Sequence, residues 1–342
     1  MLNRSDKIIA IKPLADPGNS FVRLFSEAVA QQGYRIRDFD WHDIENIGAH
    51  AAILHWPYEL LGLGGLRGIG RYLDFRSKLA RARAQGTRII WVAHNAQPHD
   101  GGWVSRMLMR RFVGMIDGII HLSHHSRVLV DQLYSPASRI VQIETVHGDY
   151  RDVMELPLQA APPMEQQVRL AYFGQIRRYK NVELLARLVA AMPAEVTLCI
   201  AGRRSHEDVA VEIERIAAQA PNITLDIRSE PLPDADIERV VDAAHGVVLP
   251  YQAILNSGAA IFALSRGRPV LAPRTGSLPE LQQIVGADWL QLYEGVLDSR
   301  ALSDFVRWLS VRPPLAMPDL KALSWDRVSD DIGGLLDAVT AS

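Results

Sequence analysis

The stretch GVVLPYQAILNSGAAIFALSRGRPVLAP, residues 246–273, has the pattern of one strand–helix–strand unit. GVVLP and RPVLAP are short apolar runs bounded by proline, as in buried strands, and the segment between them is helix-like. Two buried strands joined through a helix predict parallel neighbours in a sheet that helices cover. Asn256, Ser257 and Gly258 stand where this helix is expected to begin, and small polar residues there require an explanation.

The same alternation of strand and helix patterns continues on both sides of this stretch. The expected strands are residues 7–12, 34–39, 51–56, 88–93, 118–123 and 139–144, then 168–174, 195–202, 223–229, 246–250, 268–273 and 288–293. Residues 155–167, ELPLQAAPPMEQQ, have no clean period and are interpreted as a linker. The sequence therefore predicts an α/β protein with two doubly wound, Rossmann-like domains facing a cleft, where ligands meet the carboxyl ends of the strands.

We expect the first domain to span residues 1–158 and the second to span residues 159–323. The last segment, residues 324–342, reads as a helix that packs back on the first domain. Ser20 is the expected N-cap of the first helix, and the turn with Asn19 and Ser20 is expected to line the cleft.

Charge is distributed unevenly along a chain whose formal net charge is only −2 over 342 residues. From Arg67 to Arg111 there are ten Lys and Arg against two Asp and Glu, an excess of eight positive charges. Two basic helix-like segments in this region also contain bulky apolar residues, which suits the surface of an anionic membrane. The alternative is a pair of solvated helices whose apolar faces belong to the core.

Composition excludes several other classes of protein. Cys199 is the only cysteine, so neither a disulfide framework nor a cysteine metal site is expected. The start MLNRSDKIIAIKP lacks the apolar core of a signal peptide, and no apolar run is long enough to span a bilayer. We therefore expect a cytoplasmic protein, and the basic region adds peripheral attachment to the inner face of the cell membrane.

A basic loop follows the first strand of the second domain. In FGQIRRYKNVELL, residues 173–185, the strand ends at Gly174, the loop carries Arg177, Arg178 and Lys180, and a helix begins near Asn181. Side-chain cations and the free N–H groups of a helix start together favour a bound anion. A solvated loop that is merely basic is the alternative.

The opening stretch supplies a second candidate anion site. Small side chains at Ser257, Gly258 and Ala259 let a phosphate approach the N–H groups of the helix start. The alternative is a simple N-cap made by Asn256 or Ser257. Two such sites in one domain suit a diphosphate, as in a nucleotide-sugar.

Histidines follow several strands of the first domain: His55, His94, His99 and His147. Strands that end on one edge of a sheet would bring these side chains around one cleft, although a lone histidine is more often structural. Zinc binding by His94 and His99 is disfavoured, because the spacing and the missing carboxylate pattern do not match a metal motif.

The chain resembles the xanthan-type β-mannosyltransferases, a family of GT-B glycosyltransferases. The resemblance rests on these pieces in order: HWPYELL, HNAQPHDGGW, HGDYRD, FGQIRRYKNVELL, VVLPYQAILNSGAAIFALSRGRPVLAP and WLQLYEG. It implies a GT-B fold, GDP-mannose as the donor, inversion at the anomeric carbon, and a polyprenyl-diphosphate-linked oligosaccharide as the acceptor in bacterial exopolysaccharide assembly.

The resemblance also implies two groups of site residues, one in each domain. The expected donor site comprises Gly174, Arg177, Arg178, Lys180, Tyr251, Asn256, Ser257, Gly258, Ala259 and Glu294. The expected cleft and acceptor residues are Asn19, Ser20, His55, His94, Asn95, His147 and Asp149.

One departure from the broader GT-B pattern separates this chain from the retaining enzymes. Many of those carry two glutamates around the helix before the G-x-P-V strand, and here Ile254 and Phe262 occupy the two positions. Neither side chain can bind a ribose or polarise a sugar hydroxyl, which favours the inverting family.

The expected mechanism is direct displacement by an acceptor hydroxyl that a general base deprotonates. Asp100 is the first candidate for this base, followed by His99 and Glu59. Arg177, Arg178, Lys180 and the amides near Ser257 would stabilise the leaving diphosphate without a metal or other cofactor. The alternatives are a transferase that uses another donor such as a UDP-sugar, a nucleotide-sugar epimerase, and a two-lobed sugar-nucleotide binding protein without turnover. No nucleic-acid partner is expected.

Overall fold

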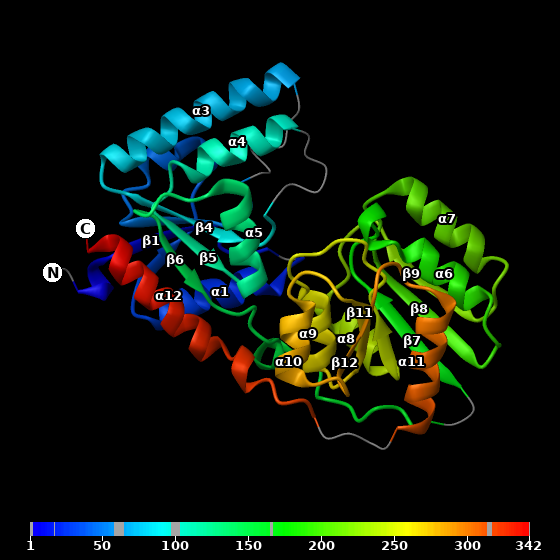
Figure 1. The fold of residues 1–342 in the computed structure, drawn as a ribbon. Helices are drawn as coiled ribbons and strands as arrows, with labels where there is room; N and C mark the ends of the chain where they lie inside the picture. Colours follow the sequence, from blue (N-terminus) through cyan, green and yellow to red (C-terminus); the bar gives the residue numbers. More distant parts are fainter. Residues whose placement is uncertain are drawn as a thin grey trace. The chain divides into compact units, whose positions relative to one another are not determined.

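The computed structural model describes residues 3–16, 18–57, 65–96, 103–164, 167–312 and 317–341. They form two compact units, each with a six-stranded parallel sheet and packed helices (Figure 1). The first unit comprises Met1–Gly148 and Leu323–Ser342, and the second comprises Asp149–Ala322. The predicted α/β class with two doubly wound sheets is confirmed.

The first sheet has the strand order β2-β1-β3-β4-β5-β6. Its strands are β1 (Ile8–Lys12), β2 (Arg35–Arg37), β3 (Ala51–Leu54), β4 (Arg88–Ala93), β5 (Gly118–His121) and β6 (Val141–Glu144). The helices are α1 (Ser20–Gln31), α3 (Gly65–Ala84), α4 (Trp103–Val113), α5 (His124–Tyr134) and α12 (Trp325–Thr340). Strand order reverses between β1 and β3, the place where doubly wound sheets bind ligands.

Helix α12 packs against α1 and β6 although it is the last helix in the chain (Figure 1). Its Ser329 hydroxyl donates to the Ala28 carbonyl at 2.8 Å, and its Asp337 carboxylate accepts from the Tyr34 hydroxyl at 2.7 Å. Asp337 also pairs with Arg4. The C-terminal residues therefore complete the first unit.

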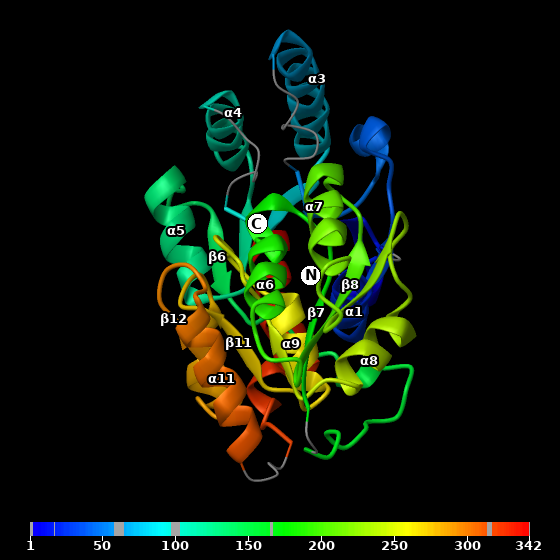
Figure 2. The ribbon, with the colours of Figure 1, turned by 90° about the vertical axis from the view of Figure 1, so that its right-hand side faces the viewer.

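The second sheet has the strand order β12-β11-β10-β7-β8-β9. Its strands are β7 (Val168–Phe173), β8 (Val196–Arg203), β9 (Ile223–Arg228), β10 (Gly246–Val248), β11 (Val270–Pro273) and β12 (Leu290–Tyr293). The helices are α6 (Val182–Ala190), α7 (Glu207–Ala217), α8 (Asp234–Asp242), α9 (Gly258–Ser265), α10 (Leu278–Val285) and α11 (Ser299–Val311), seen from a second side in Figure 2. Here the order reverses between β7 and β10, so the loops after these strands mark the expected ligand position.

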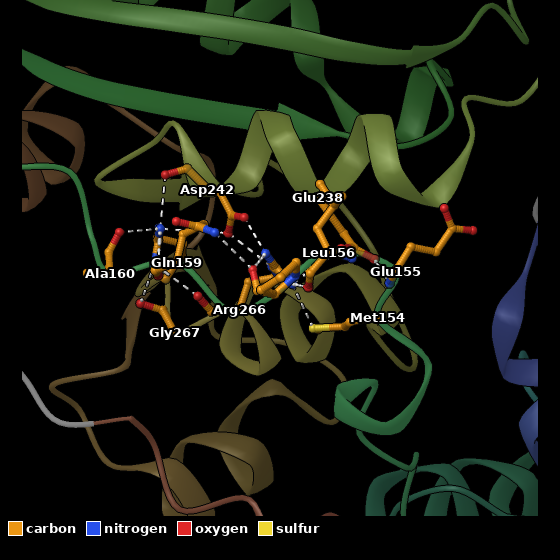
Figure 3. Close-up of polar contacts among 11 residues, drawn as sticks. Met154, Glu155, Leu156, Gln159, Ala160, Glu238, Asp242, Arg266 and Gly267 are labelled. Atoms are coloured by element: carbon orange, nitrogen blue, oxygen red, sulfur yellow. Dashed lines mark hydrogen bonds and ion pairs between the residues drawn. The ribbon is translucent and has the colours of Figure 1, made fainter.

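The segment interpreted as the start of a linker is bonded to the second unit (Figure 3). The Arg266 guanidinium is fully buried and donates to the Leu156 carbonyl at 2.8 Å. It pairs with Glu238 at 3.3 Å and also with Asp242. The Glu238 carboxylate accepts from the backbone N–H groups of Glu155 at 2.8 Å and Leu156 at 2.7 Å.

Arg268 extends the same network along the chain. Its guanidinium donates to the carbonyls of Gln159 at 3.3 Å and Ala160 at 3.1 Å. These contacts place residues 149–158 with the second unit, whereas the sequence suggested a boundary after residue 158. The difference arises because buried arginines tie to backbone carbonyls, which a composition pattern cannot reveal.

Candidate functional site

The loop after β7 is held tightly against the end of β8. Gly174 has φ +121, a conformation that favours glycine, and its N–H donates to the Ala201 carbonyl at 3.0 Å. A Cβ on Gly202 would lie 1.8 Å from the Gly174 carbonyl oxygen, so both positions need glycine for this approach. The strand end thereby fixes where the basic loop begins.

Lys180 connects the loop after β7 with the loop after β10. Its ammonium lies 3.3 Å from the Tyr251 hydroxyl and 4.7 Å from the centre of the Tyr251 ring. Ser257 hydrogen bonds to the same hydroxyl, and the Gln252 N–H donates to the Tyr179 carbonyl at 2.8 Å. Lys180, Tyr251 and Ser257 therefore form one connected polar group at the strand reversal.

Arg177 lies close to Lys180, so this group carries two neighbouring cations. Burial, and secondly the charge of Arg177, lowers the pKa of Lys180 to about 8. The Nε atom of Arg177 is buried and has no hydrogen-bond partner among the described residues. Two like charges held together are unfavourable unless an anion compensates them, which favours a bound phosphate at this point.

Arg178, the third predicted cation, is not part of this group. Its guanidinium is exposed and pairs with Asp208 at the start of α7. The predicted helix start is close to the observed one, since α6 begins at Val182 and Asn181 precedes it in a left-handed conformation.

The small residues of the opening stretch form the start of α9. Ser257 is the N-cap, and its hydroxyl accepts from the Ala260 N–H at 3.2 Å. The simple capping interpretation is therefore correct for Ser257. Gly258 and Ala259 stay partly exposed in the first turn, where backbone N–H groups lack intrahelical partners. Asn256, also partly exposed, precedes the cap.

The positions of the two absent glutamates and the predicted donor residue Glu294 also belong to the second unit. Phe262 of α9 is partly exposed, and its ring packs against those of Tyr150 and Phe173, each at 5.4 Å between ring centres. Ile254 belongs to the loop after β10. Glu294, one residue after β12, is exposed and accepts from Arg274 at 2.7 Å.

In the first unit, three of the four predicted histidines come together at the carboxyl edge of the sheet, and the fourth, His99, lies outside the described residues. His55 Nδ1 lies 2.8 Å from His94 Nε2. The Phe21 ring contacts His147 at 4.3 Å and His94 at 5.1 Å between ring centres. The ring centre of Trp325 in α12 lies 5.5 Å from that of Phe21. We call His55, His94, His147 and Phe21 the histidine cluster.

Burial keeps the histidine cluster uncharged near neutral pH. It lowers the pKa of His55 to about 3 and that of His147 to about 4. The pKa of His94 also lies well below its usual value, through burial and through the other two imidazoles. His147 Nδ1 lies 3.0 Å from the Gly148 carbonyl, which can only accept, so the proton is on Nδ1.

The other cleft residues are distributed differently from the prediction. Asn19, not Ser20, caps α1, because its side-chain oxygen accepts from the Phe21 N–H at 3.3 Å and Ser20 is the first helical residue. Asn95 follows His94 and is partly exposed. Asp149 belongs to the second unit, where its carboxylate is buried and pairs with Arg151 at 2.9 Å.

The three candidate bases, Glu59, His99 and Asp100, lie outside the described residues. Their assignment remains a prediction. Among the residues with described positions, no three His, Cys, Asp or Glu side chains come together as a metal ion would require.

Helices α3 and α4 of the basic region lie side by side (Figures 1 and 2), and Phe75 stacks on Phe112 between them at 6.1 Å. Their large apolar side chains mostly belong to the core: Tyr72, Phe75, Leu79, Leu108, Met109 and Phe112. Leu73 is an exception, with 53% of its surface exposed.

Five exposed arginines on these two helices form no salt bridge with another described residue: Arg71, Arg76, Arg106, Arg110 and Arg111. The exposed surface is thus more basic than apolar. No helix in the described part of the chain has both the length and the apolar character needed to cross a bilayer.

Sequence reasoning missed Trp56 and Trp325, which pack against the cluster. Trp56 stacks on His94 at 4.9 Å, and Trp325 contacts Phe21 from a distant part of the chain. The pattern HWPYELL offered a signal for Trp56, because a tryptophan directly follows His55 at a strand end. The sequence offered no comparable signal for Trp325.

Structural comparison identifies the fold. Sucrose-phosphate synthase from Thermosynechococcus elongatus superimposes with a TM-score of 0.67 at 15% identity, covering 98% of this chain and 95% of that one. Anabaena Alr3699/HepE in complex with UDP and glucose gives 0.64 at 11% identity, with 98% of each chain covered. The fold is that of the GT-B glycosyltransferases.

Sequence comparison gives the family. The chain is 32% identical over 284 residues to a GDP-mannose:glycolipid 4-β-D-mannosyltransferase of Xanthomonas campestris pv. campestris, covering 80% of this chain and 76% of the relative. It belongs to the family of that enzyme and is a glycosyltransferase, so the predicted family is confirmed. A scan against descriptions of known protein families finds no match.

Proposed function

We propose that this glycosyltransferase moves mannose from GDP-mannose to a polyprenyl-diphosphate-linked glycan in bacterial exopolysaccharide assembly, with inversion. The observation that carries the donor assignment is the pair Arg177 and Lys180 at the strand reversal of the second unit. The name of the Xanthomonas relative supports GDP-mannose and a glycolipid acceptor. Ile254 and Phe262, in place of two glutamates, support inversion.

The leaving diphosphate would bind where the cations and the start of α9 meet. Arg177 and Lys180 would offset its charge, and the N–H groups of Gly258 and Ala259 would donate to phosphate oxygens. Lys180 is held by Tyr251, which Ser257 also contacts, so the cation needs little reorganisation when the donor binds. This arrangement would supply the stabilisation without a metal ion.

The base would deprotonate the acceptor hydroxyl as the bond to the diphosphate breaks. Asp100 is our first candidate, followed by His99 and Glu59. Replacing Asp100 by Asn should abolish transfer and leave GDP binding within about twofold, because the amide keeps the size and loses the basicity. Retained turnover would reject Asp100 as the base.

We also propose that the exposed arginines of α3 and α4 attach the enzyme to the anionic inner face of the cell membrane from the cytoplasm. Each basic side chain near such a surface contributes about 1 kcal/mol. Replacing Arg106, Arg110 and Arg111 together by Gln should release the protein from vesicles that contain phosphatidylglycerol. Unchanged co-flotation with these vesicles would reject the assignment.

A donor and acceptor panel tests the function as a whole. The purified enzyme is incubated with GDP-, UDP- and dTDP-sugars, with and without a lipid-linked oligosaccharide acceptor. We expect consumption of GDP-mannose only when the acceptor is present. Conversion of the donor sugar without an acceptor would instead indicate an epimerase, use of another donor would correct the donor assignment, and binding without turnover would indicate a binding protein.

A further inference from the structure

Trp56 presents an indole at the carboxyl end of β3, beside the strand reversal of the first sheet. The side chain is partly exposed, and it is stacked on the His94 imidazole with 4.9 Å between ring centres and 27° between ring planes. The His55 ring centre lies 5.6 Å from that of Trp56. A large aromatic ring that remains partly exposed at the edge where such sheets bind ligands is a candidate ligand contact.

The imidazole under Trp56 is held firmly in place. His94 is hydrogen bonded to His55 at 2.8 Å, and Phe21 contacts it edge-on at 5.1 Å. His55 in turn meets Phe25 edge-on at 4.8 Å. Because these rings restrict one another's movement, the imidazole on which Trp56 stacks is preorganised. A ligand would therefore not have to order the indole on binding.

We propose that the Trp56 indole is a stacking platform for a pyranose ring of the acceptor glycan. The inference rests on the proposed function, because it names the part of the acceptor that this edge of the sheet would bind. One face of a pyranose ring presents C–H groups, which pack on an aromatic surface while the hydroxyls stay hydrated at the rim.

The surroundings favour a sugar ring over the phosphates of the same acceptor. The histidine cluster is uncharged near neutral pH, since burial holds the pKa values of His55 and His147 at about 3 and about 4. Phe21 and Phe25 add only apolar surface behind it. A diphosphate would find no cation among these rings, whereas an amphipathic ring loses little by leaving water here.

The test uses two substitutions of Trp56. Leu keeps apolar volume and removes the flat aromatic surface, whereas Phe keeps a smaller flat aromatic surface. We expect the acceptor KM of W56L to rise about tenfold and that of W56F about threefold, with the donor KM unchanged. Saturation-transfer NMR with methyl β-D-glucopyranoside and methyl α-D-mannopyranoside should show contact with the wild type and none with W56L.

Trp308 provides a matched control in the second unit. It is also partly exposed and stacked, on Phe305 at 5.9 Å, so W308L should change neither KM. An acceptor KM of W56L within twofold of the wild type, in a variant with unchanged circular dichroism, would overturn the inference, as would a change in donor KM alone. If the wild type transfers no sugar, the proposed function fails, and the NMR contact still decides the platform separately.

Discussion

The two units carry opposite chemistry at the carboxyl edges of their sheets. At the strand reversal of the second unit, Lys180 and Arg177 bring two cations together. Near the reversal of the first unit, the histidine cluster collects imidazoles that burial keeps neutral, among aromatic rings. The same topology thus yields one edge suited to an anion and one suited to an uncharged, partly apolar ligand.

This difference follows from a few residues after the strands rather than from the fold. Each sheet is parallel and reverses its order beside its first strand. After β7 the chain places lysine and arginine, whereas after β3 it places histidine and tryptophan. Binding preference in a doubly wound sheet is therefore set by loop side chains at the strand ends, and changing those side chains should test the contrast directly.

The largest effect is expected from removing the two cations at the carboxyl edge of the second sheet, which we call the charged edge. Replacing Arg177 by Gln and Lys180 by Met together should weaken GDP binding on the order of a thousandfold, because two charge-assisted contacts of about 2 kcal/mol each are lost. Isothermal titration calorimetry with GDP measures the affinity. Circular dichroism and a thermal melt verify that the double variant is folded.

Arg178 supplies the control for charge in the same loop. It is exposed and pairs with Asp208, so replacing it by Gln should change GDP affinity less than threefold. Equal losses for this variant and for the double variant would mean that the loop attracts the nucleotide only through its overall charge.

The second effect is a loss of stability in acid, which we expect the histidine cluster to cause. His55 and His147 have folded pKa values of about 3 and about 4, below the unfolded value of about 6.5, so the unfolded chain binds more protons between these limits. Their contribution is present above pH 6.5 and is lost as the pH falls. Between pH 6.5 and pH 5 these two imidazoles alone should lower the free energy of unfolding by about 3 kcal/mol. His94, whose pKa also lies well below its usual value, should add to this drop.

Urea unfolding at several pH values measures this drop, and hydrogen exchange of β3 and β4 peptides locates it in the first unit. Replacing His147 by Gln should reduce the drop by about 1.5 kcal/mol, because the amide does not titrate. The exposed His42 serves as the control, and its replacement by Asn should leave the slope unchanged. A stability that is flat from pH 6.5 to pH 5 would contradict the buried, neutral state of the cluster.

The fold could be predicted from the sequence because its signal is local. Twelve short apolar runs separated by helical patterns correspond to the twelve strands of the two sheets, for example residues 168–174 to β7 (Val168–Phe173). The sequence did not predict which single residue caps the first helix. Ser20 and Asn19 are both favourable N-cap residues, and only the backbone conformation shows that Asn19 is the one used.

The arrangement of the candidate site was predictable where its residues follow strand ends and unpredictable where their contacts depend on distant packing. The histidines after β3, β4 and β6 come together as strand order requires, and Lys180 lies at the predicted loop. Arg178 points elsewhere because Asp208, thirty positions further along, pairs with it. Trp325 reaches the cluster only because α12 packs on the first unit, which needs the tertiary structure.

The smallest expected effect separates the two roles of the start of α9. Replacing Ser257 by Ala removes the cap on the Ala260 N–H and should cost about 1 kcal/mol of stability. The backbone amides of Gly258 and Ala259 remain, so GDP affinity measured by calorimetry should fall less than threefold. A tenfold loss of affinity with unchanged stability would mean that the Ser257 hydroxyl itself contacts the diphosphate. In that case, capping would be secondary, and the charged edge would extend from Lys180 through Tyr251 to the helix start.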